Sequence, residues 1–433
     1  MILFHSKYRL NKAFLLVMNS PLPLIDNLEH LPNPFTQFHG ILEPLKADIP
    51  QLQKMDYQRD LQLALCFIYS YNGSQATFNS YRREVERLLL WSWSTQDSPA
   101  LSLRRDQIEE FIHFCNTPPE DWIGTKNVAR FKNKMGERVP NEEWRPFVAH
   151  VSKMEFRNGQ VPLSQHYNLS QAAIRATFSI LSSYYGFLMQ EEAVQQNPVA
   201  LIRQKSKFVK KEVTRRQVRR ISNLQWDYVI ETAELLAEED PATHERTLFI
   251  MNALLGMYLR ISELVADERS APIMGDFIKD SDGHWWFKVL SKGNKERLVS
   301  VSDEMLNALA RYRRFRQLPD LPTVAEQTAL IPKTRGQGAM TSSRQVRNIV
   351  QNCFDQAYYR MCDDGLKSDA DDLRVATVHW LRHTGISEDV KVRPKEHVRE
   401  DAGHASMATT DRYIDTEYRE RHASGRKKTL KPH

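Results

Sequence analysis

Two histidines and an arginine lie close together in the stretch "VHWLRHTGIS", residues 378–387. If this stretch is helical, His379, Arg382 and His383 are three or four residues apart and share one face. A zinc protease would carry His-Glu-x-x-His, but Trp380 stands where the acid is needed, so the pattern argues against a metalloprotease. For the stretch taken alone, a packed helix face with satisfied polar groups explains the pattern as well as a catalytic centre does.

Further residues that could bind or cleave a phosphodiester occur elsewhere in the second half of the chain. The stretch "DAGHASMATTDRYIDTE" contains His404 and Tyr413, and upstream "GMYLRISEL" contains Arg260 and Glu263. Between them, "SKGNKER" places Lys292 in a turn between two predicted strands. Each pattern is common by itself, but their occurrence in this order is a strong signal.

In this order the stretches resemble the active site of the tyrosine recombinase (phage integrase) family, which has an arginine, a hairpin lysine, a His-x-x-Arg, a Gly-His and a tyrosine. The resemblance covers about residues 60–420 and implies a mainly α fold with a small antiparallel β-sheet: an all-helical core-binding domain followed by an α+β catalytic domain. The catalytic residues that it implies are Arg260, Lys292, His379, Arg382, His404 and Tyr413. Glu263 would support the first arginine, and His383 would support the site rather than act directly.

Phosphodiester chemistry suits these residue types. The guanidiniums of Arg260 and Arg382 can hold the non-bridging oxygens on which negative charge accumulates during in-line attack. The phenol of Tyr413 has an unperturbed pKa of about 10 and needs a proton acceptor, for which His379 is the nearest candidate in the motif. The product would be a 3′-phosphotyrosyl enzyme, and rejoining would need no metal or other cofactor.

The general acid and the nucleophile each have a rival. Lys292 would protonate the departing 5′ oxygen, with Lys295 as the alternative, and Tyr418 is the alternative to Tyr413. Two stretches depart from the family pattern. Bulky residues at 257–259 precede the first arginine, where a small residue and glycine are usual, and "GISEDVKVRPKEHVRE" is unusually polar.

Amphipathic helices are predicted before the catalytic region. "TFNSYRREVERLLLWSWS" and a helix that begins after Ser170 as N-cap both carry apolar stripes at helical spacing, and "RRDQIEEFIHFC" is a further helix. The stripes consist of Phe78, Tyr81, Val85, Leu88 and Leu89 in the first of these, and of Ile174, Phe178, Leu181, Tyr185 and Leu188 in the helix after Ser170. The first helix also has a basic side, formed by Arg82, Arg83 and Arg87.

A basic stretch separates the two predicted domains. Nine basic residues lie between Arg203 and Arg220 against one acid, Glu212, which suits either a solvated linker or a segment that lies along phosphates. The predicted DNA-binding residues are Arg82, Arg83, Arg87, Lys205, Lys207, Lys210, Lys211, Arg215, Arg216 and Arg219.

The domain prediction follows these changes in pattern. It comprises an N-terminal extension of unknown role (1–56), the helical domain (57–204) with a loop-like or short-helical insertion at about 116–165, the basic linker (205–220), the catalytic domain (221–420) and a basic tail (421–433). Within the catalytic domain, "DFIKDSDGHWWFKVLSKGNKERLVSV" predicts three short strands.

Composition restricts the class of protein but not its function. The 433 residues are 41% hydrophobic and 26% charged, with a net charge of +6, which fits an ordered protein with more than one domain. The four cysteines form no CxxC pair and no run is long enough to span a membrane, so we expect a cytoplasmic protein without metal sites.

The resemblance implies double-stranded DNA recombination sites as partners, a homo-tetramer on paired sites and exchange through a Holliday junction. The extension and the insertion favour the integrase of a mobile element, which would work with an accessory directionality factor. Two alternatives stay open: a non-catalytic DNA-binding regulator on the same fold, and an enzyme like the type IB topoisomerases.

Overall fold

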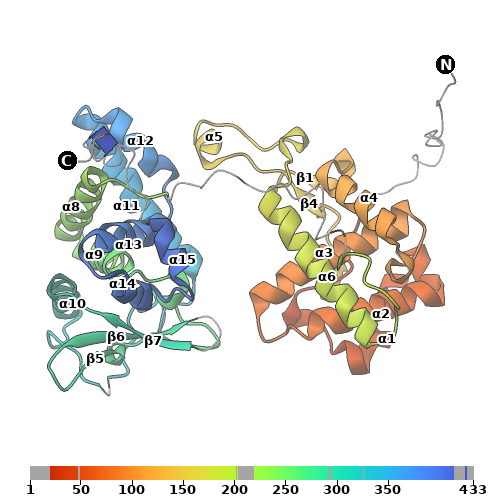
Figure 1. Cartoon of the computed structure of the whole chain (residues 1–433), viewed down its shortest axis with the longest axis horizontal. Helices are drawn as coiled ribbons and strands as arrows, with labels where there is room; N and C mark the ends of the chain where they lie inside the picture. The colour runs from red at the N-terminus through yellow and green to blue at the C-terminus, as the bar shows by residue number, and fades with distance from the viewer. Residues whose placement is uncertain are drawn as a thin grey trace, which may run out of the picture. The chain divides into compact units, whose positions relative to one another are not determined.

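A computed structural model of the chain describes residues 20–46, 49–200, 202, 219–291, 295–324, 326–413 and 425–426. The chain divides into two compact units, Met1–Val213 and Thr214–His433, each with its own hydrophobic core (Figure 1). The boundary falls inside the basic stretch that was predicted to be a linker, most of which lies outside the described residues.

The described residues are mainly helical with small β-sheets, as predicted. The helices of the first unit are α1 (Pro34–Lys46), α2 (Met55–Tyr69), α3 (Gln75–Thr95), α4 (Arg105–Asn116), α5 (Lys153–Arg157) and α6 (Gln171–Gln190), and its strands are β1 (Ile123–Gly124), β2 (Phe131–Lys134), β3 (Glu137–Pro140) and β4 (Phe147–Val148). The helices of the second unit are α8 (Asn223–Glu239), α9 (Pro241–Gly256), α10 (Asp303–Phe315), α11 (Ser343–Asp363), α12 (Lys367–Val375), α13 (Val378–Val392), α14 (Lys395–Ala402) and α15 (Met407–Thr410), and its strands are β5 (Phe277–Lys279), β6 (Trp285–Ser291) and β7 (Lys295–Ser300). Short 3₁₀ turns are η2 (Leu28–His30), η3 (Pro50–Gln53), η4 (Ala100–Ser102), η5 (Glu120–Trp122), η6 (Ser164–His166), η7 (Ile261–Glu263), η8 (Met274–Asp276) and η9 (Asp411–Tyr413).

Two capped helices, α3 and α6, form the centre of the first unit. The Ser74 hydroxyl caps α3 by accepting from the Thr77 N–H, and the Ser170 hydroxyl caps α6 by accepting from the Ala173 N–H at 3.1 Å. The predicted stripe of α6 is fully buried, and that of α3 is buried except for Tyr81, which packs against the same core at partial exposure. Both helices are therefore confirmed with the faces that their periodicity predicted.

The described part of the predicted N-terminal extension belongs to the core of the first unit. Leu24, Ile25, Leu42 and Leu52 are 2%, 1%, 3% and 0% exposed and pack among the side chains of α2 and α3. The proline-rich composition gave no helical period, so this packing could not be read from it.

The insertion differs from its expected form as a loop or short helices. Besides the short helix α5, it holds two small sheets: β1 pairs in parallel with β4, and β2 pairs with β3 as an antiparallel hairpin. These strands were missed because they are two to four residues long and those of the hairpin carry mostly exposed polar side chains, so no alternating apolar pattern marks them.

A helical bundle and one sheet make up the second unit. The sheet has the order β5-β6-β7 and is antiparallel throughout, with Phe277 opposite Phe287 and Phe287 opposite Val299, so the three predicted strands are confirmed. Helices α9 and α13 lie side by side, and α14 lies against β7 (Figure 1). Gly385 permits the contact of α13 with α9, since a Cβ at this position would lie 2.3 Å from the Leu255 carbonyl oxygen.

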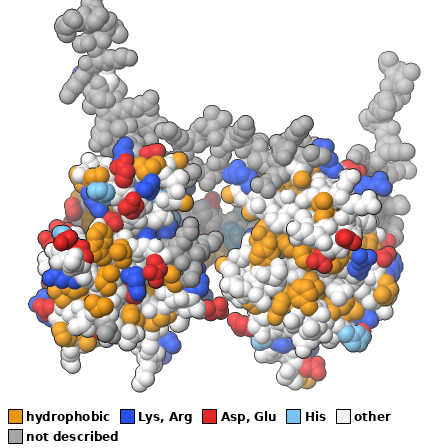
Figure 2. Space-filling view, turned by 60° about the horizontal axis from the view of Figure 1, so that its bottom comes forward, with side chains coloured by type: hydrophobic (Ala, Val, Ile, Leu, Met, Phe, Trp, Pro, Cys, Tyr) orange, Lys and Arg blue, Asp and Glu red, His pale blue; other side chains and the backbone are white. Residues whose placement is uncertain are grey.

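The surface does not separate into regions of one charge on the face drawn in Figure 2. Acidic and basic side chains there are interspersed with apolar ones over the coloured part of both units. Among the described residues, none of the helices is both long and apolar enough to cross a membrane.

Candidate active site

Seven described residues with predicted roles come from separate segments of the second unit. They are Arg260 directly before η7, Glu263 within it, His379, Arg382 and His383 on α13, His404 after α14, and Tyr413 at the end of η9. Contacts between these segments bring them into one site.

Arg382 joins three segments beneath the site. It is 2% exposed, and its guanidinium donates to the backbone carbonyl oxygens of Tyr258 and Ala402. Burial, together with the nearby positive charge of Arg260, lowers its pKa to about 10, so it remains charged at neutral pH. The buried cation thus lies where the turn after α9 and the end of α14 meet α13.

The bulky residues before Arg260 have a structural explanation. Tyr258 has φ 49°, a conformation in which glycine is usual, and it is 1% exposed. Its hydroxyl donates to the Asp389 carboxylate and accepts from Arg393 at 3.0 Å. Asp389 and Arg393 belong to the unusually polar stretch "GISEDVKVRPKEHVRE". Its polarity is therefore explained in part by Tyr258, because the buried hydroxyl needs hydrogen-bond partners and a glycine at this position would not.

The same network continues to the sheet. Arg393 also donates to Asp401 at 2.7 Å, and Asp401 accepts from the backbone N–H of Ser300 at 3.2 Å. Asp401 is 5% exposed and lies on α14, so this carboxylate fixes α14 against β7. The loop that carries His404 begins directly after this fixed helix.

Glu263 holds Arg260 in place together with a second arginine, Arg297. Its carboxylate accepts from Arg260 Nη1 at 2.9 Å and from both Nη atoms of Arg297 at 2.8 Å. Burial would raise the pKa of Glu263, but the hydrogen bonds and charge of Arg297 and then of Arg260 lower it to about 2. Arg260 keeps 35% of its side chain exposed, whereas Arg297 keeps 9%.

Arg297 also supports the glycine next to His404. The Arg297 Nε donates to the Asp401 carbonyl oxygen at 3.0 Å. Gly403 is next to the Arg297 side chain and has φ 62°. A Cβ on Gly403 would approach the Arg297 Cδ to 2.9 Å, so both the backbone conformation and the space favour glycine here. Arg297 ends the stretch "SKGNKER", but the sequence assigns it no role, and only its contact with Glu263 reveals its position in the site.

Tyr413 lies between two histidines. Its hydroxyl is 2.7 Å from Nδ1 of His383, and its ring stacks on that of His404 with centroids 5.6 Å apart and planes 15° apart. The Tyr413 side chain is 8% exposed. His404 is held in turn by a 2.9 Å contact of its Nδ1 with the hydroxyl of Thr410, which is 0% exposed.

The positions of His379 and His383 differ from the roles expected for them. The sequence predicts His379 as the proton acceptor and His383 as a supporting residue. In the structure the hydroxyl of Tyr413 meets His383, and the ring of His379 lies edge-on to the His383 ring at a centroid distance of 4.5 Å. Helical spacing places both on one face and could not decide which of them the tyrosine meets.

All three histidines of the site are neutral at physiological pH. Burial, followed by the charges of neighbouring groups, lowers the pKa of His383 to about 4 and that of His404 to about 4, and it also lowers the pKa of His379. The neighbouring cations are Arg382 for all three and Arg260 for His379 and His404. A neutral imidazole can accept a proton, so each of these three histidines is able to act as a proton acceptor.

Comparison with known proteins finds relatives in sequence and a solved structure with a similar fold. The chain is 25% identical over 287 residues to "Tyrosine recombinase XerC" of Chlorobaculum parvum, which covers 64% of this chain and 75% of that one. It is 26% identical over 253 residues to "Tyrosine recombinase XerD" of Rickettsia prowazekii, covering 57% and 72%. The XerH site-specific recombinase in its post-cleavage complex with palindromic difH substrate superposes with a TM-score of 0.53 at 14% identity, covering 92% and 98%.

The chain is homologous to the tyrosine recombinases. No protein-family model matches it. The resemblance drawn from the sequence motifs is confirmed at the level of family and fold, and the recombinase fold explains why one site is assembled from distant segments.

Several predicted residues fall outside the described part of this recombinase fold. Those are Lys292, Tyr418 and, from the basic stretch, Lys205, Lys207, Lys210, Lys211, Arg215 and Arg216. The backbone of Lys295 begins β7, but its side chain is not described, and Arg219 is exposed.

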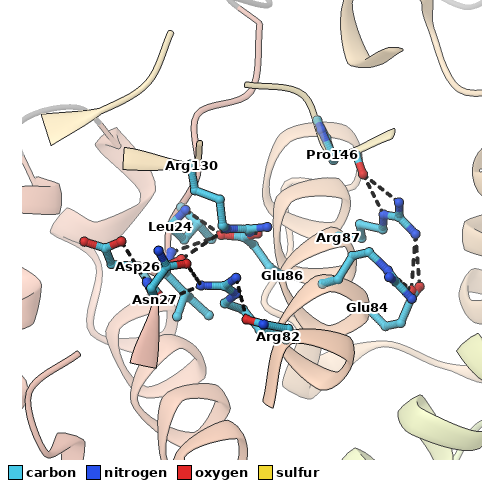
Figure 3. Close-up of polar contacts among 12 residues, drawn as sticks. Leu24, Asp26, Asn27, Arg82, Glu84, Glu86, Arg87, Arg130 and Pro146 are labelled. Atoms are coloured by element: carbon cyan, nitrogen blue, oxygen red, sulfur yellow. Dashed lines mark hydrogen bonds and ion pairs between the residues drawn. The ribbon is translucent and has the colours of Figure 1, made fainter. Parts of the chain in front are cut away.

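The three arginines of α3 do not share an exposed side. Arg82 is 6% exposed and donates to the Asp26 carbonyl oxygen and to the side chain of Asn27, while Arg87 donates to the Pro146 carbonyl oxygen at 2.6 Å (Figure 3). Only Arg83 keeps a largely exposed side chain, at 48%, with an ion pair to Glu84.

The internal contacts of Arg82 and Arg87 argue against the DNA contacts predicted for them. A helical repeat shows which residues share a side of α3, but it does not show that residues distant in sequence cover that side.

Proposed function

We propose that the protein is a site-specific recombinase that cleaves and rejoins duplex DNA through a covalent 3′-phosphotyrosyl intermediate on Tyr413. The observation that carries this proposal is the contact of the Tyr413 hydroxyl with His383 at 2.7 Å, in a site that also holds Arg260, Arg382 and His404. A tyrosine with a neutral imidazole at its hydroxyl, next to fixed cations, is equipped to attack a phosphodiester.

In the proposed cleavage step the Tyr413 oxygen attacks the scissile phosphorus. Its proton passes to Nδ1 of His383, which is neutral above a pKa of about 4. The P–O5′ bond breaks as the P–O bond to tyrosine forms, and the departing 5′ oxygen takes a proton from Lys292. Rejoining runs these transfers in reverse, so the energy of the phosphodiester is retained in the enzyme–DNA bond.

The two arginines have different places in this proposal. Arg260 is partly exposed and lies where a phosphate can receive its remaining N–H donors in bidentate fashion. Arg382 is buried and uses Nη1 and Nη2 on carbonyl oxygens, so it contributes its charge and the positions of the surrounding segments. His404, turned by its contact with Thr410, would hydrogen-bond to the scissile phosphate.

The wider setting of the reaction is part of the same proposal. Double-stranded recombination sites would be the partners, and four copies on two sites would exchange strands through a Holliday junction. XerH was solved with its DNA substrate, and a lambda integrase tetramer was solved on a Holliday junction. Integration or excision of a mobile element, with an accessory directionality factor, is the role that we propose for the reaction.

A nicked-duplex assay tests the chemistry. Duplexes from the DNA that flanks this gene, nicked so that the cleaved strand diffuses away, are incubated with the wild type and with Tyr413→Phe and then separated on a denaturing gel. A slow-migrating covalent adduct formed by the wild type alone is the expected result. DNA binding without an adduct would instead favour a non-catalytic regulator, and an adduct without strand exchange between two labelled duplexes would favour an enzyme like the type IB topoisomerases.

A further inference from the structure

The hairpin β2–β3 is a regular element within the first unit's insertion. Its strands pair from Phe131 opposite Pro140 to Lys134 opposite Glu137, so that Met135 and Gly136 form a two-residue turn. Both have positive φ, 53° and 88°, as a type I′ hairpin turn requires. A ribbon of this kind is narrow enough to enter a groove of duplex DNA.

The base of the hairpin is fixed to the body of the first unit. Just before β2, Arg130 forms a buried ion pair with Glu86 of α3 (Figure 3). Just after β3, the Asn141 N–H donates to the Arg130 carbonyl oxygen at 2.8 Å. On β3, Arg138 donates to both carboxylate oxygens of Asp26, at 2.9 and 2.7 Å. The hairpin is thus held in one orientation.

One face of the hairpin is turned to the body and the other is not. Asn133 and Arg138 are opposite each other on the face that reaches Asp26, and their side chains are in contact at 3.3 Å. Since neighbouring strand residues point to opposite faces, Lys132 and Lys134 lie on the outer face. Both are exposed, and Glu137 is opposite Lys134 on this outer face, although no ion pair of either lysine is found among the described residues.

The composition of this insertion is basic although the charge of the whole chain is small. Between Lys126 and Arg138 there are five basic residues and one acid, Glu137. At the tip, Met135 is 99% exposed, in a turn position that asparagine would occupy with less strain. Packing in the first unit explains neither the exposed methionine nor the outer lysines.

We infer that the outer face of this hairpin is a DNA-contacting element, with Lys132 and Lys134 on backbone phosphates and Met135 at the tip inside a groove. This inference rests on the proposed function, because it requires that the first unit binds duplex DNA. Lysines on phosphates supply affinity without sequence information, whereas an apolar tip in a groove contacts base edges. The insertion would thereby add to the DNA surface that the helices of the first unit contact.

Salt dependence of binding tests the lysines. The full-length chain is titrated onto a labelled 30-base-pair duplex of random sequence at several salt concentrations, and log Kd is plotted against log salt. For Lys132→Ala/Lys134→Ala we expect the slope to fall by about 2, since each lost phosphate contact removes about 1. The matched variant Lys132→Arg/Lys134→Arg keeps both charges and should keep the wild-type slope.

Met135→Asn tests the tip and separates binding from folding. Asparagine suits the positive φ, so the variant should be at least as stable as the wild type in thermal unfolding. If Met135 lies in a groove, the same variant should bind the duplex several-fold more weakly. If Met135→Asn binds the duplex with wild-type affinity, Met135 does not lie in a groove of the DNA.

The outcomes distinguish this inference from the recombinase proposal. An unchanged salt slope in the double alanine variant, or a wild-type chain that does not bind the duplex, overturns the role of the hairpin. If the wild type forms the Tyr413 adduct while the slope is unchanged, only the hairpin inference fails. If the slope falls but no adduct forms on any substrate, the hairpin binds DNA and the catalytic proposal fails.

Discussion

The hydroxyl of Tyr413 lies 2.7 Å from Nδ1 of His383, whereas His379, the histidine of the family's His-x-x-Arg motif, contacts the His383 ring instead. The first prediction follows from this difference. Removing a general base costs about 10²- to 10⁴-fold in rate, so His383→Ala should slow adduct formation on the nicked duplex by at least about 10²-fold. His379→Ala is the matched control and should slow it less. The rates are measured in single turnover, and a larger loss with His379→Ala would return the role of proton acceptor to that residue.

A second prediction concerns pH. Burial, then neighbouring charges, lowers the pKa values of His383 and His404 from 6.5 to about 4. Between these values the unfolded chain binds more protons than the folded one, so the free energy of unfolding should fall as the pH falls from 6.5 to 4. Urea unfolding at a series of pH values measures this.

His383→Gln identifies the contribution of one histidine to that decline. Glutamine does not titrate, so the variant should lose stability less steeply over the same pH range. Its control is His284→Gln, because His284 is exposed on the turn before β6. Equal pH dependence of wild type and His383→Gln would mean that His383 keeps its ordinary pKa in the folded protein.

The third prediction concerns Arg297, to which the sequence assigns no role. Removing one partner of a buried ion pair costs about 3–5 kcal/mol where it leaves a charge unpaired. In Arg297→Met the Glu263 carboxylate keeps its ion pair with Arg260, so we expect a smaller loss, of about 1–3 kcal/mol, in the free energy of unfolding. Arg269→Met removes an exposed ion pair with Asp267 and should change stability by less than about 1 kcal/mol. Both are compared by urea unfolding. Adduct formation by Arg297→Met should also slow, because Glu263 then holds Arg260 without its second partner.

Local patterns predicted the helices and the central sheet of this protein. The stripes of α3 and α6, with Ser170 as a cap, lie within single segments, and the turns around β6 are marked by their own residues. The order of the motifs, through the family resemblance, predicted Arg260, Arg382, His404 and Tyr413 as site residues, and the structure brings these four together.

Contacts between distant segments could not be predicted in this way. The pairing of Glu263 with Arg297 and that of Tyr258 with Asp389 depend on how the turn after α9 packs against the sheet and α13. The inward position of Arg82 depends on residues before α1 that have no periodic pattern. Which of His379 and His383 contacts the Tyr413 hydroxyl depends on where η9 places the tyrosine. The spacing of residues on α13 carries no information about that position.

A fourth prediction tests the network that fixes the hairpin of the first unit. Glu86 is 0% exposed, accepts from the backbone N–H groups of Leu24 and Ile25 at 2.7 and 3.0 Å, and pairs with Arg130. Glu86→Ala leaves Arg130 buried without its ion-pair partner, so we expect a loss of about 3–5 kcal/mol in the free energy of unfolding. Limited proteolysis should show earlier cleavage near the β2–β3 hairpin. Glu109→Ala, which removes an exposed pair with Arg105, should leave both measurements unchanged.

The last prediction uses two glycines of the second unit that differ in their surroundings. A Cβ at Gly385 would lie 2.3 Å from the Leu255 carbonyl oxygen and 3.0 Å from the Tyr258 ring, so Gly385→Ala must push α13 away from α9. The site depends on that contact, because Arg382 on α13 binds the Tyr258 carbonyl oxygen. We therefore expect Gly385→Ala to lose both stability and adduct formation. At Gly256 the nearest atom to a Cβ outside the helix's own backbone would be Met305 Sδ at 3.9 Å, so Gly256→Ala should be tolerated and serves as the control. Wild-type stability and adduct formation in Gly385→Ala would show that α13 and α9 do not pack this closely.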